Sequence, residues 1–201
     1  MPKKLKIAVT GGIGTGKSTV CKIFQSHGYP VLYADQISKD ILSTDKIIQQ
    51  KIIEEFGSKS FIDGEPNTKF LSEKVFSDFQ KVKKINSILH PAVINVINKK
   101  MDEGLTKSNI VFVEAALIFE ANMEDLFDYV LVVSASERVK IERVVNSRKM
   151  NEEEVKKIIN NQFPDDKKKS TADFVIENNG TESDLEKKVN FVLMVIKSLK
   201  Q

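Results

Sequence analysis

Residues 11–18 read GGIGTGKS and fill every specified position of the phosphate-binding pattern G-x-x-x-x-G-K-[ST]. The glycines of such a loop let backbone N–H groups approach phosphate oxygens where a Cβ would clash. Lys17 adds a positive charge, and the Ser18 hydroxyl can reach a magnesium ion. The stretch therefore predicts a site for a nucleoside triphosphate with Mg²⁺.

The sequence on both sides of this loop supports a strand-to-helix connection. Leu5–Thr10 is a short apolar run suited to a buried parallel strand, and Val20, Ile23 and Phe24 fall on one side of the helical pattern that follows. The loop then ends at a helix N-terminus, where unpaired N–H groups and the helix dipole favour an anion. The alternative is a glycine-rich turn without a ligand, and the presence of both Lys17 and Ser18 after the strand argues against it.

Composition predicts a cytoplasmic globular protein. The 201 residues suffice for one sizeable core with a helical insertion, and the hydrophobic content is 41%. The single cysteine, Cys21, excludes an internal disulfide and is expected to be a packing residue. We expect no membrane contact, because no run of eighteen apolar residues occurs. The net charge of +3 is mild, so we expect no nucleic-acid binding, and no obligate protein partner is evident.

Apolar, β-branched runs alternate with helical patterns along the chain. Such alternation indicates an α/β fold with a parallel, doubly wound sheet covered by helices on both faces, three layers in all. The expected strands of this five-stranded sheet are Leu5–Thr10, Val31–Ala34, Ile110–Glu114, Tyr129–Val133 and Phe174–Glu177.

The segment between the second and third strands is far longer than a single crossover helix. We expect an inserted helical subdomain there, with helical pattern in Ile37–Phe56 and Phe70–Leu89 around a turn region at Gly57–Pro66. A further helix is expected to begin at Pro91, since proline suits the first helical position.

A second insertion is charged and helical, and it could close as a lid. The last segment, Leu185–Leu199, reads as an amphipathic helix covering the sheet. The predicted division is a nucleotide-binding core of residues 1–35, 108–136 and 170–201, a helical acceptor domain of residues 36–107, and a lid of residues 137–169.

Charged residues follow the expected strands, where active sites of such sheets form. Asp35 can face the transferred phosphoryl group or its metal, and its alternative role is a helix N-cap. Glu114 can order metal-bound water, or it can be a solvated or capping residue. Arg143 and Arg148 in the lid can reach phosphate on closure, or they can belong to a solvated helix face.

An ordered set of motifs along nearly the whole chain resembles the dephospho-coenzyme A kinase family. Residues 11–19 are similar to that family's phosphate loop, with Thr15 in place of a serine. The other matching segments are Ala34-Asp35, Leu89-His90-Pro91, Leu117–Glu120, Gln162 with Lys168 and Ala172-Asp173, and Val175–Gly180.

The resemblance implies transfer of the ATP γ-phosphoryl group to the ribose 3′-hydroxyl of dephospho-coenzyme A, with Mg²⁺, on a P-loop kinase fold. It implies catalytic roles for Asp35, Lys17 and Arg143, and a role in metal binding for Ser18. Asp35, His90, Leu117 and Glu120 would bind the acceptor. The nucleotide would be bound by Gly12, Gly14, Thr15, Gly16, Lys17, Ser18, Thr19, Arg143, Asn178 and Gly180.

The chain departs from the family pattern at several places. Tyr33 stands where the family often has a first aspartate, and Ala116 stands where it usually has proline. The spacing from Arg143 to Arg148 is one residue longer than expected, so Arg143 is the better lid candidate. His90 has an alternative as a capping or packed histidine before Pro91.

Two other protein classes share the phosphate loop. A small GTPase needs an Asn-Lys-x-Asp motif and an Asp-x-x-Gly switch, and the sequence contains neither. A nucleoside monophosphate kinase would share the core, the lid and magnesium. Only the family motifs distinguish it from a dephospho-coenzyme A kinase.

Overall fold

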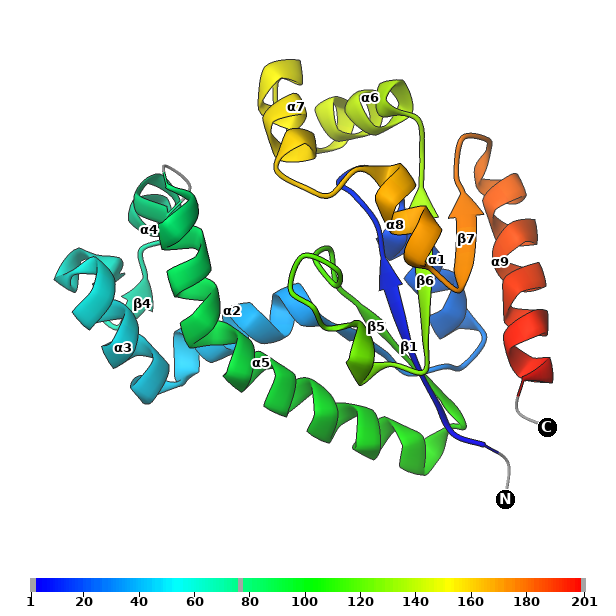
Figure 1. Cartoon of the computed structure of the whole chain (residues 1–201), viewed down its shortest axis with the longest axis horizontal. Coiled ribbons are helices and arrows are strands. Elements are labelled where there is room, and N and C mark those ends of the chain that lie inside the picture. The colour runs from blue at the N-terminus through cyan, green and yellow to red at the C-terminus, as the bar shows by residue number, and fades with distance from the viewer. Residues whose placement is uncertain (1–2, 76–77, 200–201) are drawn as a thin grey trace. The chain divides into compact units, whose positions relative to one another are not determined.

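The runs expected as strands form a five-stranded parallel sheet in the computed structural model, which describes residues 3–75 and 78–199 (Figure 1). The strand order is β2-β5-β1-β6-β7, so the predicted parallel α/β sheet is confirmed. The bounds agree with expectation to within one residue: β1 Leu5–Thr10, β2 Val31–Tyr33, β5 Ile110–Glu114, β6 Tyr129–Ser134 and β7 Phe174–Glu177.

Helices cover both faces of this sheet. On one face, α1 (Lys17–Ser26) and α9 (Glu182–Ser198) share a buried core with the strands, and the Phe24 ring of α1 stacks on Phe112 of β5 at 3.9 Å between centroids. Val111 points to the other face, where a Cβ on Gly104 of α5 (Phe79–Lys107) would lie 3.3 Å from its side chain. Because alternate residues of β5 are buried on opposite faces, the molecule has the expected three layers.

The chain divides into two compact units. One consists of the residues up to Tyr33 and from Lys100 onward, and it contains the sheet. The other is Ala34–Lys99, which overlaps the predicted acceptor domain. Besides the first part of α5, this second unit contains α2 Ala34–Thr44, α3 Lys46–Phe56, the 3-10 turn η1 Ser58–Ser60, the hairpin of β3 Phe61–Ile62 and β4 Glu65–Pro66, and α4 Thr68–Val75.

Two helix predictions in this second unit were wrong. The pattern over Ile37–Phe56 is broken at Asp45, whose carboxylate accepts hydrogen bonds from the N–H groups of Ile47 and Ile48 and so begins a new helix. No helix begins at Pro91, because α5 runs through it. Proline removes one helical hydrogen bond, and the burial of residues such as Ile97 on the same helix offsets that loss. Residues 76 and 77 of the expected Phe70–Leu89 helix lie outside the described residues.

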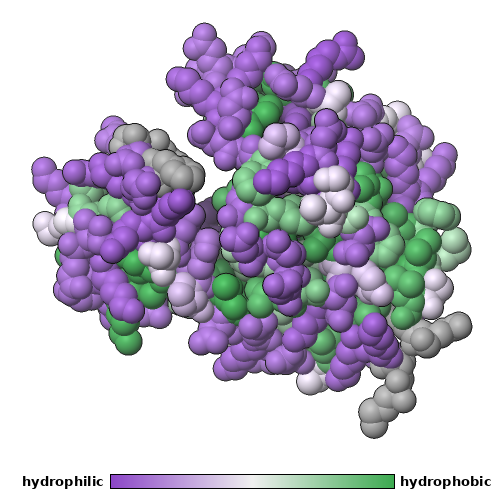
Figure 2. Space-filling view, viewed as in Figure 1, coloured by the Kyte–Doolittle hydropathy of each residue, from purple (hydrophilic) through white to green (hydrophobic). Residues whose placement is uncertain are grey.

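Two charged helices follow β6 in the expected lid segment. They are α6 Glu137–Arg148 and α7 Glu152–Asn160, and the surface over them is largely hydrophilic (Figure 2). A capping box of Asn151 and Glu154 begins α7. The next helix, α8 Asp165–Thr171, extends two residues beyond the predicted end of the lid, Lys169.

The remaining elements close the sheet-bearing unit. A short 3-10 turn, η2 Glu124–Leu126, precedes β6. The final helix α9 begins three residues before the predicted start at Leu185, because Thr181 and Asp184 form a capping box. Among the helices of residues 3–75 and 78–199, none is both long and apolar enough to cross a bilayer.

Candidate active site

The phosphate loop connects β1 to α1 and is closely packed against two other segments. A Cβ on Gly14 would lie 2.6 Å from the Lys140 carbonyl oxygen, and one on Gly16 would lie 2.4 Å from the side-chain nitrogen of Asn178. Both glycines also have positive φ, 76° and 95°, which other residues rarely adopt. Gly16 precedes the first turn of α1 and offers no side chain to its N–H groups, so these groups can bind an anion.

The polar side chains of the loop have different surroundings. Lys17 is partly buried, and its Nζ donates to the carbonyl oxygen of Gly12 at 3.1 Å. Ser18 is exposed, and its hydroxyl donates to the Glu114 carboxylate at 3.2 Å. Thr15 is fully buried and its hydroxyl donates to the Gly12 carbonyl at 2.9 Å. Thr15 therefore offers a ligand its backbone N–H rather than its side chain.

Glu114 ends β5, and its charge contributes to the raised pKa of two nearby groups, Cys21 and Tyr33. Burial, and then the Glu114 charge, raise the pKa of the Cys21 thiol, which confirms Cys21 as a packing residue. Burial is also the main cause that raises the pKa of Tyr33, whose hydroxyl donates to Gln25 at 3.0 Å. Tyr33 is paired in register with Glu114. Where the family pattern often has a carboxylate, this chain thus has a neutral hydroxyl.

Arg143 and Asn178 meet beside the phosphate loop. The Arg143 guanidinium donates to the Asn178 backbone carbonyl at 3.0 Å and to its side-chain oxygen at 3.3 Å. The Asn178 side chain in turn donates to the Thr15 carbonyl at 2.9 Å. With Gly16 and Thr19, both residues line a cavity of about 230 Å³. Four predicted nucleotide-binding residues therefore lie together around one cavity.

Two other residues of the predicted site have different positions. Gly180 is not among the residues of that cavity, and a Cβ on it would lie 2.9 Å from the Asp184 carboxylate. Arg148 is exposed at the last position of α6.

The loop after β5 carries two residues predicted to bind the acceptor. Leu117 is 42% exposed. One Glu120 oxygen accepts from the Phe163 N–H at 2.9 Å and pairs with the Lys168 ammonium, whose side chain is fully buried, at 2.8 Å. That carboxylate oxygen is therefore bound by the protein itself, and a substrate role for Glu120 stays a prediction.

Asp35 and His90 belong to the other unit. Asp35 is exposed in the first turn of α2, one residue after the helix begins, so it follows the carboxyl end of β2 as expected. His90 is partly buried within α5, and burial lowers its pKa, so the imidazole is neutral near pH 7. Their catalytic and acceptor-binding roles stay predictions.

Sequence reasoning did not identify the contacts that Lys140 and Gln162 make with the loop. Gln162 accepts a hydrogen bond from the Ile13 N–H at 3.0 Å, although 149 positions separate the two residues. The backbone of Lys140 lies against Gly14. In the sequence, Gln162 matches the family only by its spacing to Lys168, and that spacing does not indicate its contact with the loop.

Comparison with known proteins gives a consistent family. Residues 5–196 match the sequence profile described as dephospho-CoA kinase. A dephospho-CoA kinase of Fusobacterium nucleatum is 41% identical over 184 residues, which are 91% of this chain and 94% of that protein.

Solved structures similar to this chain include a protein of the same family. A dephospho-CoA kinase from Campylobacter jejuni has a TM-score of 0.73 at 27% identity and covers 98% of both chains. The protein TT1252 from Thermus thermophilus has a TM-score of 0.83 at 29% identity, covering 96% of this chain and 97% of that one. The profile match extends over most of the chain, and it includes the phosphate loop, β5, helices α6 and α7, and the Asn178 segment. This chain therefore belongs to the dephospho-CoA kinase family.

Proposed function

We propose that this chain transfers the γ-phosphoryl group of ATP to the ribose 3′-hydroxyl of dephospho-coenzyme A, giving coenzyme A and ADP. The observation that carries the proposal is the family match over residues 5–196, combined with a complete phosphate loop at the start of α1. The reaction would be the last step of coenzyme A synthesis. We expect it to take place in the cytoplasm without an obligate protein partner.

The phosphate loop would bind the triphosphate. The transition state of phosphoryl transfer is loose, so positioning and neutralisation of charge dominate catalysis. Lys17 would leave the Gly12 carbonyl and bind the β- and γ-phosphate oxygens, while backbone N–H groups of residues 12–19 surround the phosphates.

Ser18 and Glu114 have the hard oxygen atoms that Mg²⁺ prefers, and they lie 3.2 Å apart. Ser18 would bind the ion directly, and Glu114 would accept hydrogen bonds from its water ligands. Bound Mg²⁺ supplies positive charge to the phosphate oxygens. Among the described residues no cluster of three or more His, Cys, Asp or Glu side chains could hold a metal, so the nucleotide phosphates would complete the coordination.

Arg143 and Asn178 would bind the nucleotide next to the loop. Their hydrogen bonds hold the guanidinium beside Gly16 and Thr19, at the start of the helix that binds the phosphates. Gly180, two residues after Asn178, would contribute to nucleotide binding only through its backbone. From this position, small movements of α6 would bring Arg143 to the transferring phosphoryl group.

Asp35 would accept the proton of the attacking hydroxyl. A ribose hydroxyl is far too weak an acid to ionise unaided near pH 7, so a carboxylate within hydrogen-bond reach is needed. Asp35 is exposed and therefore available to a substrate. His90, Leu117 and Glu120 are proposed to bind the acceptor, His90 as a neutral imidazole.

We expect dephospho-coenzyme A to be phosphorylated far faster than any nucleoside monophosphate. The family motifs separate the two acceptor classes, since the core and lid alone would suit both. ADP release should be measured with ATP and, in turn, dephospho-coenzyme A, AMP, CMP and dTMP. Faster turnover of AMP or CMP would contradict the proposed acceptor.

We expect Arg143→Ala to lower kcat by about a thousandfold, and to lower it more than it weakens ATP binding to the free enzyme. The reason is that a lid arginine stabilises the transition state only after closure. Steady-state kinetics and ATP titration of the variant would test this, with the exposed Arg138→Ala as a control on the same helix. A loss of ATP affinity alone would make Arg143 an anchor of bound ATP.

A further inference from the structure

One residue of the phosphate loop belongs to the hydrophobic core of the lid. Ile13 is 8% exposed and packs with Val144 of α6 and Val155 of α7, which are 2% and 0% exposed. Partly buried residues of the same two helices and their connection complete the cluster: Ile141, Val145, Met150, Ile158 and Ile159. The lid helices are therefore packed around a side chain of the loop that they would cover.

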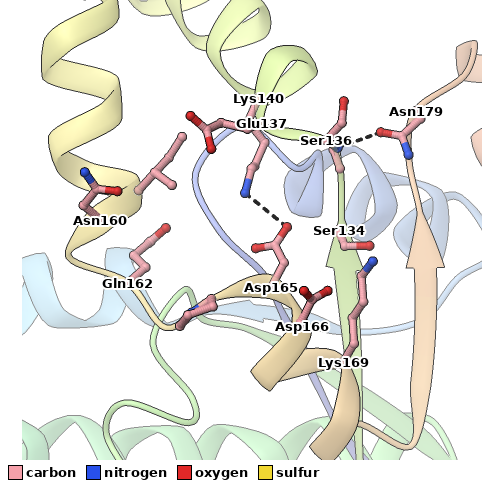
Figure 3. A pocket seen from close by; sticks show the side chains of 13 residues that line it. Ser134, Ser136, Glu137, Lys140, Asn160, Gln162, Asp165, Asp166, Lys169 and Asn179 are labelled. Atoms are coloured by element: carbon pink, nitrogen blue, oxygen red, sulfur yellow. Dashed lines mark hydrogen bonds and ion pairs between the residues drawn. The ribbon is translucent and has the colours of Figure 1, made fainter.

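The backbone of the same residue is held by Gln162. The Gln162 side-chain oxygen accepts from the Ile13 N–H at 3.0 Å. A Cβ on Gly12 would lie 3.2 Å from that oxygen and 3.6 Å from a carboxylate oxygen of Asp165, so both side chains lie directly against the first turn of the loop. Gln162 comes from the segment between α7 and α8, and its side chain extends toward the other polar groups of the same cavity (Figure 3).

Two ion pairs hold the segment that carries Gln162. Asp165 pairs with Lys140 of α6 at 3.1 Å, and both side chains are largely buried (Figure 3). On the other side, Glu120 binds the Phe163 N–H and the fully buried Lys168 ammonium. Breaking a buried ion pair by removing one partner is costly, so these contacts hold in place the backbone from which the Gln162 side chain extends.

A glycine-rich loop loses much backbone freedom when it closes around phosphates. A hydrogen bond that already holds the first turn of the loop lowers the conformational entropy that is lost when phosphates bind. Such preorganisation increases the affinity for the nucleotide. We propose that Gln162 is a positioning residue of the phosphate loop, which orients the Ile13 peptide so that the remaining N–H groups point at the β-phosphate. This inference rests on the proposed nucleotide site at residues 11–18.

The test compares ADP with AMP, because the loop surrounds the β-phosphate and AMP lacks it. Gln162→Met keeps the length of the side chain and removes the acceptor oxygen. The control is Asn160→Leu, which likewise replaces an amide by an apolar group of similar size, at an exposed position two residues earlier where no described residue forms a hydrogen bond with the side chain. ADP affinity is measured by calorimetric titration, and AMP affinity by its competition with ADP at the same site.

We expect the ratio of AMP to ADP dissociation constants to fall at least about tenfold in Gln162→Met, with AMP affinity nearly unchanged. The control should keep the wild-type ratio. The melting temperature of Gln162→Met should fall by roughly 2–6 °C, since one hydrogen bond is lost and the Ile13 N–H is left without its partner. If Gln162→Met shows no cooperative melt, Gln162→Asn withdraws the same amide by one methylene and should lower the ratio in the same way.

A ratio within about twofold of wild type in a folded variant would overturn the positioning role. An equal loss of AMP and ADP affinity would also overturn it, because Gln162 would then act on the fold as a whole. If the wild-type protein itself bound ADP no more tightly than AMP, the proposed nucleotide site would fail, and the inference with it.

Discussion

Replacing Lys17 by alanine is expected to reduce phosphoryl transfer roughly a thousandfold or more. Lys17 supplies charge to the β- and γ-phosphates, and that charge is most valuable when the transferring group separates. Its side chain is partly buried and makes a hydrogen bond to the Gly12 carbonyl, so its removal should change the melting temperature by only a few degrees. Steady-state rates and thermal melts of the purified variant measure the two effects.

The matched control for this prediction is Lys22→Ala. Lys22 is exposed on the same helix α1 and lies outside the loop. The Lys22→Ala variant should therefore keep the wild-type rate of phosphoryl transfer. Near-native turnover in Lys17→Ala would mean that residues 11–18 do not bind the phosphates of ATP.

The second large effect is expected at Asp35. Asp35→Asn should lower the rate by about a hundredfold to ten-thousandfold, because an amide cannot accept the hydroxyl proton. The side chain is exposed in the first turn of α2, so the fold loses only the interaction of one negative charge with the helix dipole, about 0.3–1 kcal/mol. Thermal stability should therefore remain nearly unchanged.

The measurement pairs the melting temperature with the steady-state rate, with magnesium titrated to detect any metal-orienting role. Asp40→Asn serves as the control, since Asp40 is exposed on the same helix and its carboxylate accepts a hydrogen bond from Gln36 at 2.7 Å. Full activity of Asp35→Asn would reduce this residue to a surface charge at the start of α2. A large loss of stability with a proportionate loss of activity would make it structural.

Local patterns were sufficient for the sheet. The strands are short apolar runs bounded by polar or turn residues, and that pattern located β1, β5 and β7 to the residue. Helix ends inside the insertion were harder to locate, because they depend on whether side-chain capping and packing outweigh the helical pattern of the sequence. At Asp45 a side chain bonds to backbone N–H groups and interrupts a continuous pattern, and at Pro91 packing elsewhere on α5 outweighs a residue that favours a helix start.

The amino-acid sequence by itself determined the phosphate loop, its place between β1 and α1, and the family, because each motif that indicates them consists of residues close together in the chain. Only the tertiary structure decided which partners the polar side chains have. Arg143 bonds to Asn178, Glu120 pairs with Lys168, and Gln162 bonds to Ile13. These partners are 35, 48 and 149 positions apart, respectively, so no local spacing predicts them. They meet only in the folded chain, in which Ile13 of the loop also packs with Val144 of α6 and Val155 of α7 in one hydrophobic core.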